Sequence, residues 1–195
     1  MRAYGLIVVA ATLFAATAAA QQPAQAPPQE PIIIGPPPPP ATALEGFSVP
    51  PGEVLTTAYE DVGDVDGVLV EAREMRDPRA HRVRGIVVTI VSPQSSPQQA
   101  FVDPDEFVTL IRAFDALLGI TQNPSGQFRN FDMRFSTRGE LVLTASSTRN
   151  RGVLYGVEVG RVQHARRTLN GGEFSQLRTL VEAAQQKLAA LREER

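Results

Sequence analysis

The fold is decided by two stretches of similar sequence, "AFVDPDEFVTLIRAFDALLGI" at Ala100–Ile120 and "RTLNGGEFSQLRTLVEAAQQKL" at Arg167–Leu188. One offset of 67 positions aligns them, placing Asp103 opposite Asn170 (170 − 103 = 67) and Glu106 opposite Glu173. An Asp or Asn followed three positions later by Glu is typical of a capping box at a helix N-terminus. The sequence therefore predicts two helices that begin in the same way.

Both predicted helices carry one apolar face. In the first, Pro104 suits the first helical position and Gly119 is placed to end the helix. The apolar residues that recur at helical spacing are Phe107, Leu110, Ile111, Phe114, Leu117 and Leu118, then Phe174, Leu177, Leu180, Val181, Ala184 and Leu188. Each helix is therefore expected to pack this face on a sheet.

Strand-forming runs precede both helices. The same offset aligns RGIVVTIV at 84–91 with RGVLYGVE at 151–158. Further strand candidates occupy 54–60, 68–75, 128–136 and 141–147, with short ones around 99–102 and 163–169. We predict an α+β domain made of two pseudo-repeats, about 54–120 and 121–192, each with antiparallel strands followed by one amphipathic helix packed on the sheets.

Four strands and a helix, repeated over residues 54–192, resemble the whirly and PUR-repeat architecture in topology. In those families the doubled module forms two sheets with helices between them and binds single-stranded nucleic acid. The chain carries none of their signature sequences, so the resemblance transfers no functional residue. A nucleic-acid face would also need exposed aromatic side chains for base stacking, for which Tyr59 and Tyr155 are the candidates.

Residues 1–20 have the three-part build of a secretory signal peptide. Arg2 precedes an apolar run from Leu6 to about Ala18, and small residues lead to Gln21. The alternative is an uncleaved anchor, but the run is short for a span of roughly 20 residues. We therefore expect a periplasmic or secreted protein with no membrane span after cleavage. The chain has no Cys, which excludes disulfides, thiolate catalysis and a lipoprotein anchor.

Residues 21–51 are rich in Pro, which fixes φ and lacks a backbone donor. We expect an extended, disordered linker there, acting as a solvated tail, a spacer or a ligand for a Pro-reading module. Residues 52–195 suffice for a single domain with its own core. The formal net charge of −2 does not call for a polyanionic partner.

Catalytic, metal and cofactor signals are weak, and we predict none of the three. "DVGDVDG" at 61–67 invites a calcium site, but Val62 and Arg73 stand where an EF-hand needs oxygen ligands. His81 and His164 are the only histidines, and each lies among arginines, with no G-x-S-x-G sequence in the chain. A hydrolase would need one of them to meet a Ser and a carboxylate in a pocket between the two halves.

Clusters of arginine suggest an anion-binding surface, because a guanidinium binds phosphate or carboxylate through two parallel hydrogen bonds. The offset makes Arg84 and Arg151 pseudo-symmetry mates, and the candidate ligands of an anion are Arg82, Arg84, Arg151 and Arg161. The alternative is a solvated strand face in which the arginines pair with Glu71, Glu74 and Glu158.

These observations favour an exported, non-catalytic binding or assembly module of the cell envelope, with a protein partner that contacts a sheet face or edge. The first alternative is a single-stranded nucleic-acid-binding protein of the resembled fold, against which the signal peptide argues. The second is a hydrolase. Neither the ligand nor the oligomeric state follows from the sequence.

Overall fold

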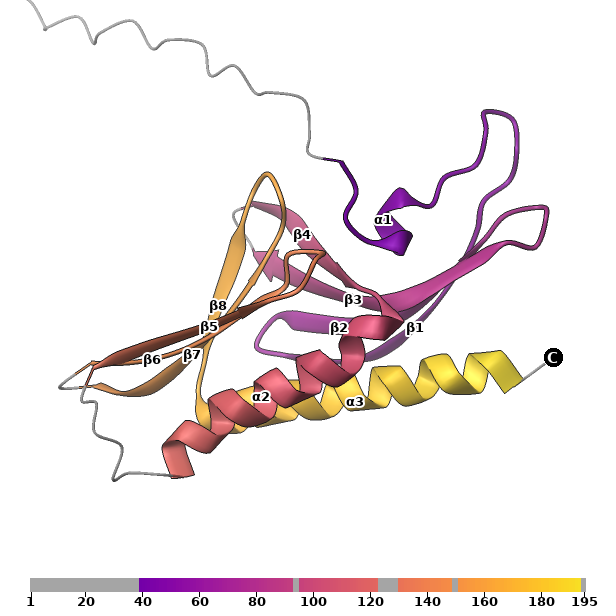
Figure 1. Ribbon diagram of the computed structural model, residues 1–195. Coiled ribbons are helices and arrows are strands. Elements are labelled where there is room, and N and C mark those ends of the chain that lie inside the picture. Colours follow the sequence, from indigo (N-terminus) through magenta and orange to yellow (C-terminus); the bar gives the residue numbers. More distant parts are fainter. Residues whose placement is uncertain (1–38, 93–94, 123–129, 149–150, 194–195) are drawn as a thin grey trace, which may run out of the picture. The chain divides into compact units, whose positions relative to one another are not determined.

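The computed structural model describes residues 39–92, 95–122, 130–148 and 151–193, and contains two antiparallel sheets of four strands each (Figure 1). Sheet 1 follows chain order with β1 (Thr56–Val65), β2 (Val68–Arg76), β3 (Arg82–Ser92) and β4 (Ser95–Val102). Sheet 2 does the same with β5 (Phe131–Ser136), β6 (Val142–Thr148), β7 (Arg151–Val159) and β8 (Ala165–Leu169). Tight connections between successive strands make both sheets simple meanders.

A helix follows each sheet. The short helix η1 (Pro104–Glu106) leads from β4 into α2 (Phe107–Gln122), and β8 leads into α3 (Gly171–Glu193). The predicted α+β class and its duplicated plan of strands followed by a helix are therefore confirmed. The helix α2 continues through Gly119 to Gln122, so the expected end at that glycine was wrong. A glycine inside a helix costs only about 1 kcal/mol, which packing of the apolar face outweighs.

Sheet register shows which residues of the two repeats are equivalent. In sheet 1, Ala72 pairs with Ile86, which pairs with Val102. The corresponding row in sheet 2, which also ends just before a helix, consists of Ala145, Tyr155 and Leu169. The offsets along this row are 73 (145 − 72), 69 (155 − 86) and 67 (169 − 102). The single offset of 67 therefore holds only for the last strand and the helix, because the connections between strands differ in length.

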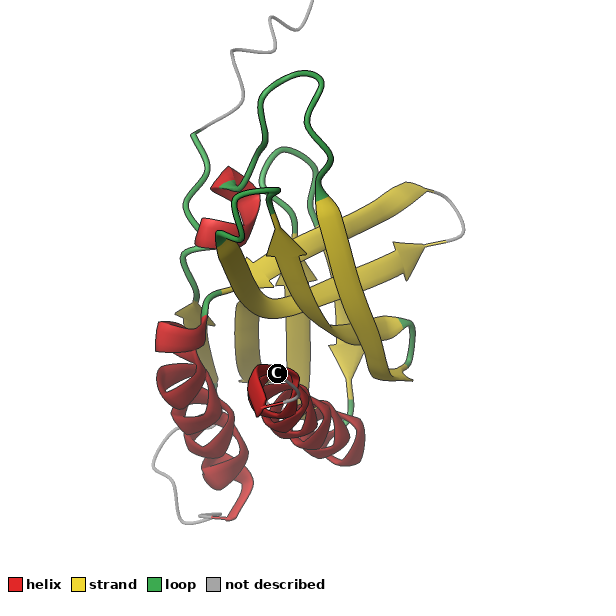
Figure 2. Ribbon diagram, turned by 90° about the vertical axis from the view of Figure 1, so that its right-hand side faces the viewer, coloured by secondary structure: helices red, strands yellow, loops and turns green. Residues whose placement is uncertain are grey.

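The two repeats are interlocked by their helices. Helix α3, which follows sheet 2, packs along β1 and β2 of sheet 1, whereas α2, which follows sheet 1, contacts α3 and β6 of sheet 2. Figure 2 shows the two helices next to each other on one side of the strands. Gly63 in β1 permits this approach, because a Cβ there would lie 2.9 Å from Cδ2 of Leu180 in α3. Each helix thus completes the core of the other repeat.

One apolar core joins both sheets and both helices. Its largest side chains include Phe114 of α2, Phe174 of α3 and Tyr155 of β7, each at most 1% exposed. The ring centroids of Phe114 and Phe174 are 4.9 Å apart, and Tyr155 stacks on Phe174 at 4.5 Å with an interplanar angle of 17°. Burial of these rings, at about 25 cal/mol per Å² of apolar surface, is the main force that holds the repeats together.

The folded part begins before the expected boundary at residue 52. Residues Ala43–Gly46 form a short helix, α1, on the face of sheet 1 opposite α3 (Figure 1). Leu44 of α1 is 2% exposed, and a Cβ at Gly85 in β3 would lie 2.5 Å from its Cδ1. The missing side chain at Gly85 is therefore what gives Leu44 its place on the sheet.

Candidate binding site

Of the four arginines proposed as anion ligands, Arg84 and Arg161 form separate ion pairs within the fold. Arg84 in β3 pairs with Glu74 of β2 at 2.5 Å and is 17% exposed at its side chain, while Arg82 is exposed on the same strand. Arg161 lies between β7 and β8. Arg151 opens β7, but its side chain lies outside the described residues. The sheet register also equates Arg151 with Arg82 (82 + 69 = 151), so Arg84 and Arg151 are not equivalent.

Two of these arginines neutralise carboxylates of the fold. Glu74 is only 4% exposed and accepts hydrogen bonds from Arg76 at 2.6 Å as well as from Arg84. Burial alone would raise the pKa of Glu74, but the hydrogen bonds and charges of Arg76 and Arg84 outweigh it and hold the pKa below its usual value. Arg84 is therefore committed to a structural ion pair, in line with the alternative that the sequence left open.

Arg161 contacts the segment that contains α1 and the residues just before it. Its guanidinium donates to the carbonyl oxygen of Pro39 at 2.7 Å and lies 3.4 Å from a carboxylate oxygen of Glu45 in α1. A second carboxylate, that of Glu140 in the turn between β5 and β6, lies 3.6 Å from its Nε. Arg161 thus joins the segment before α1 to the turns at one end of sheet 2.

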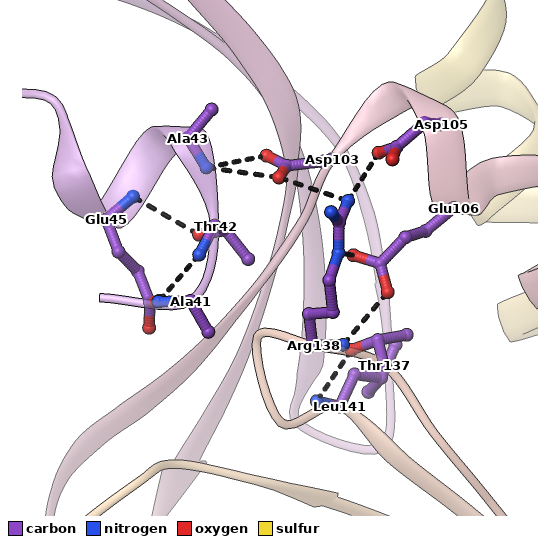
Figure 3. Close-up of polar contacts among 10 residues, drawn as sticks. All are labelled: Ala41, Thr42, Ala43, Glu45, Asp103, Asp105, Glu106, Thr137, Arg138 and Leu141. Carbon is purple, nitrogen blue, oxygen red and sulfur yellow. Dashed lines mark hydrogen bonds and ion pairs between the residues drawn. The ribbon is translucent and has the colours of Figure 1, made fainter. Parts of the chain in front are cut away.

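The helix α1 carries its own capping box and is bound at its N-terminus by Asp103. The side chain of Thr42 accepts from the backbone N–H of Glu45 at 3.2 Å, and Glu45 accepts from the backbone of Thr42 at 3.2 Å. Both carboxylate oxygens of Asp103 accept from the N–H of Ala43, at 3.0 and 3.1 Å (Figure 3). A carboxylate at this position satisfies a backbone donor that the helix itself leaves free.

The expected role of Asp103 as the cap of the following helix was therefore wrong. Its side chain makes no capping hydrogen bond to η1. Glu106, expected to complete the box, instead accepts from the backbone N–H of Arg138 at 2.9 Å. Both acidic side chains of this motif are turned toward other segments of the chain.

The turn between β5 and β6 is held by the same acidic side chains (Figure 3). The guanidinium of Arg138 lies 2.5 Å from Asp105, 3.4 Å from Asp103 and 3.4 Å from Glu106. Desolvation would lower the pKa of Arg138, but the charges of Glu106, Asp105 and Asp103 outweigh it and raise the pKa above its ordinary value. Thr137 closes the turn, because its hydroxyl accepts from the N–H of Leu141 at 3.1 Å.

This fixed turn forms one wall of an open polar recess on the outer face of sheet 2, with a volume of about 400 Å³. Its lining comes from β5, β6, the turn between them, β7 and the β7–β8 connection, and consists of Arg134, Ser136, Thr137, Arg138, Glu140, Val142, Glu158 and His164. All but one of these side chains are polar. A recess of this size accommodates a small polar ligand or the side chains of a peptide.

Two carboxylates give the recess its acidic part. Glu140 has φ of 61°, a left-handed conformation that favours glycine and costs a residue with a side chain about 1 kcal/mol or more. Its carboxylate nevertheless occupies this position, facing Arg161 and the recess. Glu158 lies 3.4 Å from Nδ1 of His164, whose side chain is 53% exposed. The recess therefore presents groups of both charge signs.

The two histidines occupy different settings. His81 lies in the turn between β2 and β3, where its Nδ1 is 2.8 Å from Asp77. Burial would raise the pKa of Asp77, but the hydrogen bonds and charge of His81 outweigh it and lower the pKa. His164 meets Glu158 in the recess that Ser136 also lines. Ser136 and Glu158 both pair with Val142, on opposite sides of it, so they lie two strands, or about 10 Å, apart.

This spacing does not bring a serine, a histidine and a carboxylate into hydrogen-bonding reach. No hydrogen bond between His164 and Ser136 occurs in the described part of the chain. Within the described ranges, no three His, Cys, Asp or Glu side chains are grouped as metal ligands, and this includes Asp61, Asp64 and Asp66. None of the described helices is long and apolar enough to cross a membrane.

The two tyrosines named for base stacking differ in exposure. Tyr59 in β1 is 65% exposed, whereas Tyr155 is 1% exposed and stacked in the core. The alternation of β7 explains this, because Val157 and Val159 share the inward face with Tyr155. Tyr155 is therefore not a surface contact.

Comparison of the chain with protein-family models, with curated proteins and with solved structures found no match.

Sequence reasoning named Glu158 and His164 without placing them together, and it missed Arg134, Arg138 and Glu140. The recess is assembled from three strands and two connections between strands, and no motif spans them. One signal was present and overlooked, namely the T-x-x-E spacing of Thr42 and Glu45 at the end of the Pro-rich segment. It marks α1, and with it the point at which the chain first joins the domain.

Proposed function

We propose that the protein is an exported, non-catalytic binding module of the cell envelope, and that the recess on sheet 2 holds a polar group of its partner. The observation that carries this proposal is the recess itself. It brings the pair of Glu158 and His164 into one recess with Glu140, whose turn Arg138 fixes to three acidic side chains. Fixed groups of both signs favour a partner segment that also carries both signs.

Preorganisation supports a binding role for this wall. The β5–β6 turn is held by the side chain of Thr137, by Arg138 and by an isolated bridge between Phe101 and Gly139. Little conformational entropy would then be lost at this wall when a partner binds. The strain at Glu140 is consistent with this interpretation, since glycine would suit the backbone better but would not supply a carboxylate.

Nucleic-acid binding is the function that the whirly-like and PUR-like topology would suggest. It has less support, because the burial of Tyr155 leaves Tyr59 as the exposed stacking candidate, far from the recess in sequence and on the other sheet. A hydrolase has less support as well, because Ser136 lies about two strand spacings from Glu158. Export rests on the signal-peptide pattern of residues 1–20.

The test is a quantitative pull-down from envelope extract with the immobilised protein and two matched double variants. Glu158→Gln with His164→Gln removes the acid–histidine pair of the recess. Asp77→Asn with His81→Gln removes the other such pair, which lies on the β2–β3 turn. Both histidines are exposed, and Asp77→Asn and Glu158→Gln each keep an acceptor oxygen in place of the carboxylate, so both variants are expected to fold.

We expect a partner that binds the unchanged protein and the Asp77/His81 variant, and binds the Glu158/His164 variant at least about tenfold more weakly. Equal capture by all three proteins would show that the recess is not the contact. Capture of nothing at all by the unchanged protein would contradict the binding-module proposal.

A further inference from the structure

The strand β5 lies at an edge of sheet 2. It pairs with β6 and with no other strand of the described ranges. The N–H of Thr137, just after β5, donates to the carbonyl of Leu141 at 3.0 Å, which fixes the alternation of the ladder. Odd-numbered residues of β5 therefore bond to β6, and the backbone groups of Asp132, Arg134 and Ser136 point to the free edge.

The two faces of β5 differ in character. Phe131, Met133 and Phe135 face the core but are only partly buried. Asp132 and Arg134 are exposed on the outer face, and neither has an ion-pair partner among the described residues. An edge strand with a free hydrogen-bonding row and incompletely covered aromatic side chains is a template for another strand.

The sequence of this edge is complementary to itself. Consider two β5 strands that pair antiparallel, with Met133 of one copy opposite Met133 of the other. The numbers of any two facing residues then add up to 266. Asp132 then faces Arg134 of the other copy, and Phe131 faces Phe135. The backbone groups that point outward, those of Asp132 and Arg134, fall in hydrogen-bonded pairs, as an antiparallel ladder requires.

Charge selects this alignment over its neighbours. A shift by two residues in one direction would place Arg134 opposite Arg134, and in the other Asp132 opposite Asp132. Like charges directly opposite each other destabilise a sheet, whereas opposite charges and aromatic pairs stabilise it. An odd shift would turn the aromatic side chains to the outer face.

We propose that β5 pairs antiparallel with β5 of a second copy of this chain, which joins two four-stranded sheets into one sheet of eight strands (4 + 4). The self-complementary charges favour a second copy over an unrelated peptide as the occupant of this edge. The inference goes beyond the proposed function, since it concerns the free edge of β5, which adjoins the recess through Arg134 and Ser136 but does not depend on Glu158 or His164.

The first experiment is a cysteine cross-link in the full chain, which has no native Cys. In the proposed pair, Met133 faces Met133 of the other copy at a non-hydrogen-bonded position, where Cβ atoms lie about 5 Å apart. Mild oxidation of Met133→Cys should therefore give a disulfide-linked dimer. Val108→Cys, at a 57% exposed position on α2, is the matched control and should give no disulfide-linked dimer.

The second experiment uses charge reversal, with oligomeric state measured by sedimentation equilibrium and native mass spectrometry. Asp132→Arg and Arg134→Asp should each weaken the dimer at least about tenfold, because each sets like charges opposite each other across the pair. The double variant, with both changes in one chain, should restore the dimer. A mixture of the two single variants should form the heterodimer in preference to either homodimer. Both changes are at exposed edge positions, and unchanged circular dichroism verifies the fold.

Three outcomes would overturn the proposal. The chain could remain monomeric up to about 500 µM, where even a weak strand pair would be populated. A dimer could form that neither charge reversal weakens, which would place the contact elsewhere. The Met133→Cys variant could cross-link no faster than the Val108→Cys control. The pull-down that tests the recess changes Glu158 and His164, whereas the dimer experiments change residues of β5. Either proposal can therefore fail without the other.

Discussion

The two long helices begin with nearly the same motif and use it differently. At α3, Asn170 accepts from the N–H groups of Gly172 and Glu173 at 2.9 and 3.0 Å, and Glu173 accepts from the N–H of Asn170 at 2.8 Å. At α2, Asp103 binds α1 and Glu106 binds the β5–β6 turn. The second copy of the motif stabilises its own helix, whereas the first joins three segments of the chain.

This difference teaches that a local motif can be diverted to tertiary contacts once the helix has other support. Helix α2 buries Phe107, Leu110, Phe114 and Leu117, so its start does not depend on a cap. Pro104 at the first helical position removes one unsatisfied donor as well. The acidic side chains are then free to fix α1 and one wall of the recess, which gives the first repeat a role that the second lacks.

Among the substitutions that test this difference, Asp103→Ala should lower the free energy of unfolding the most. The carboxylate is 9% exposed, accepts two contacts from α1 and lies 3.4 Å from Arg138, so its loss should lower the free energy of unfolding by about 3 kcal/mol. Hydrogen exchange at residues 41–47 should rise at the same time. Asp105→Ala, at a 69% exposed side chain, is the control and should cost less than about 1 kcal/mol. Equal effects of the two would mean that Asp103 does not anchor α1.

Glu74→Gln should have an intermediate effect, which depends on pH. The pKa of Glu74 is lowered in the folded state, so its contribution to stability is complete above the unfolded value of 4.5 and is lost as pH falls through the lower folded value. The variant should lose about 2 kcal/mol at pH 7, and the two proteins should become equally stable in acid. Urea denaturation between pH 7 and pH 2 measures this convergence. A constant difference across that range would rule out the ion pairs as its cause.

The same position sharpens the comparison of the repeats. In sheet 2 the register places Ser147 where sheet 1 has Glu74 (74 + 73 = 147). The buried ionic group therefore belongs to the first repeat, as do the acidic residues that hold α1. Acid is expected to loosen sheet 1 before sheet 2, which hydrogen exchange at pH 4 can follow strand by strand.

Asn170→Ala should have the smallest effect of the three. It removes an ordinary capping box, which costs about 1 kcal/mol and leaves every other segment in place. Thermal unfolding measures the loss, and exchange at residues 41–47 should not change. An Asn170→Asp variant should retain most of the stability, because Asp also caps helices. Release of α1 by Asn170→Ala would show that the two motifs are not as different as the contacts indicate.

The strands and helices could be predicted from sequence because their signals are local. Alternation placed β5 to within a few residues, and helical spacing placed Phe174, Leu177 and Val181 on the buried face of α3. The end of α2 could not be predicted, since Gly119 alone does not show whether packing continues beyond it. The equivalence of Arg84 and Arg151 failed for a related reason, because a constant offset ignores connections of unequal length.

The site could not be predicted because its contacts join residues far apart in the chain. Arg161 pairs with Glu45 across 116 positions, and Arg138 pairs with Asp105 across 33. Many carboxylates were available to each arginine, and only the fold selects among them. The helix α1 was also not predicted, because it lies within residues 21–51. The high Pro content of that stretch indicated a disordered linker, although Thr42 and Glu45 have the spacing of a capping box.

The crossed packing of the helices has a consequence for the order in which the protein can fold. The inner face of sheet 1 is covered by α3, whose buried residues run to Leu188. A chain that grows from its N-terminus makes all four strands of this sheet long before it makes their cover. The apolar face of sheet 1 therefore stays exposed until α3 has been synthesised. If the protein is exported unfolded, as we propose, such a delay would be an advantage, because the native core could not close before α3 had crossed the membrane.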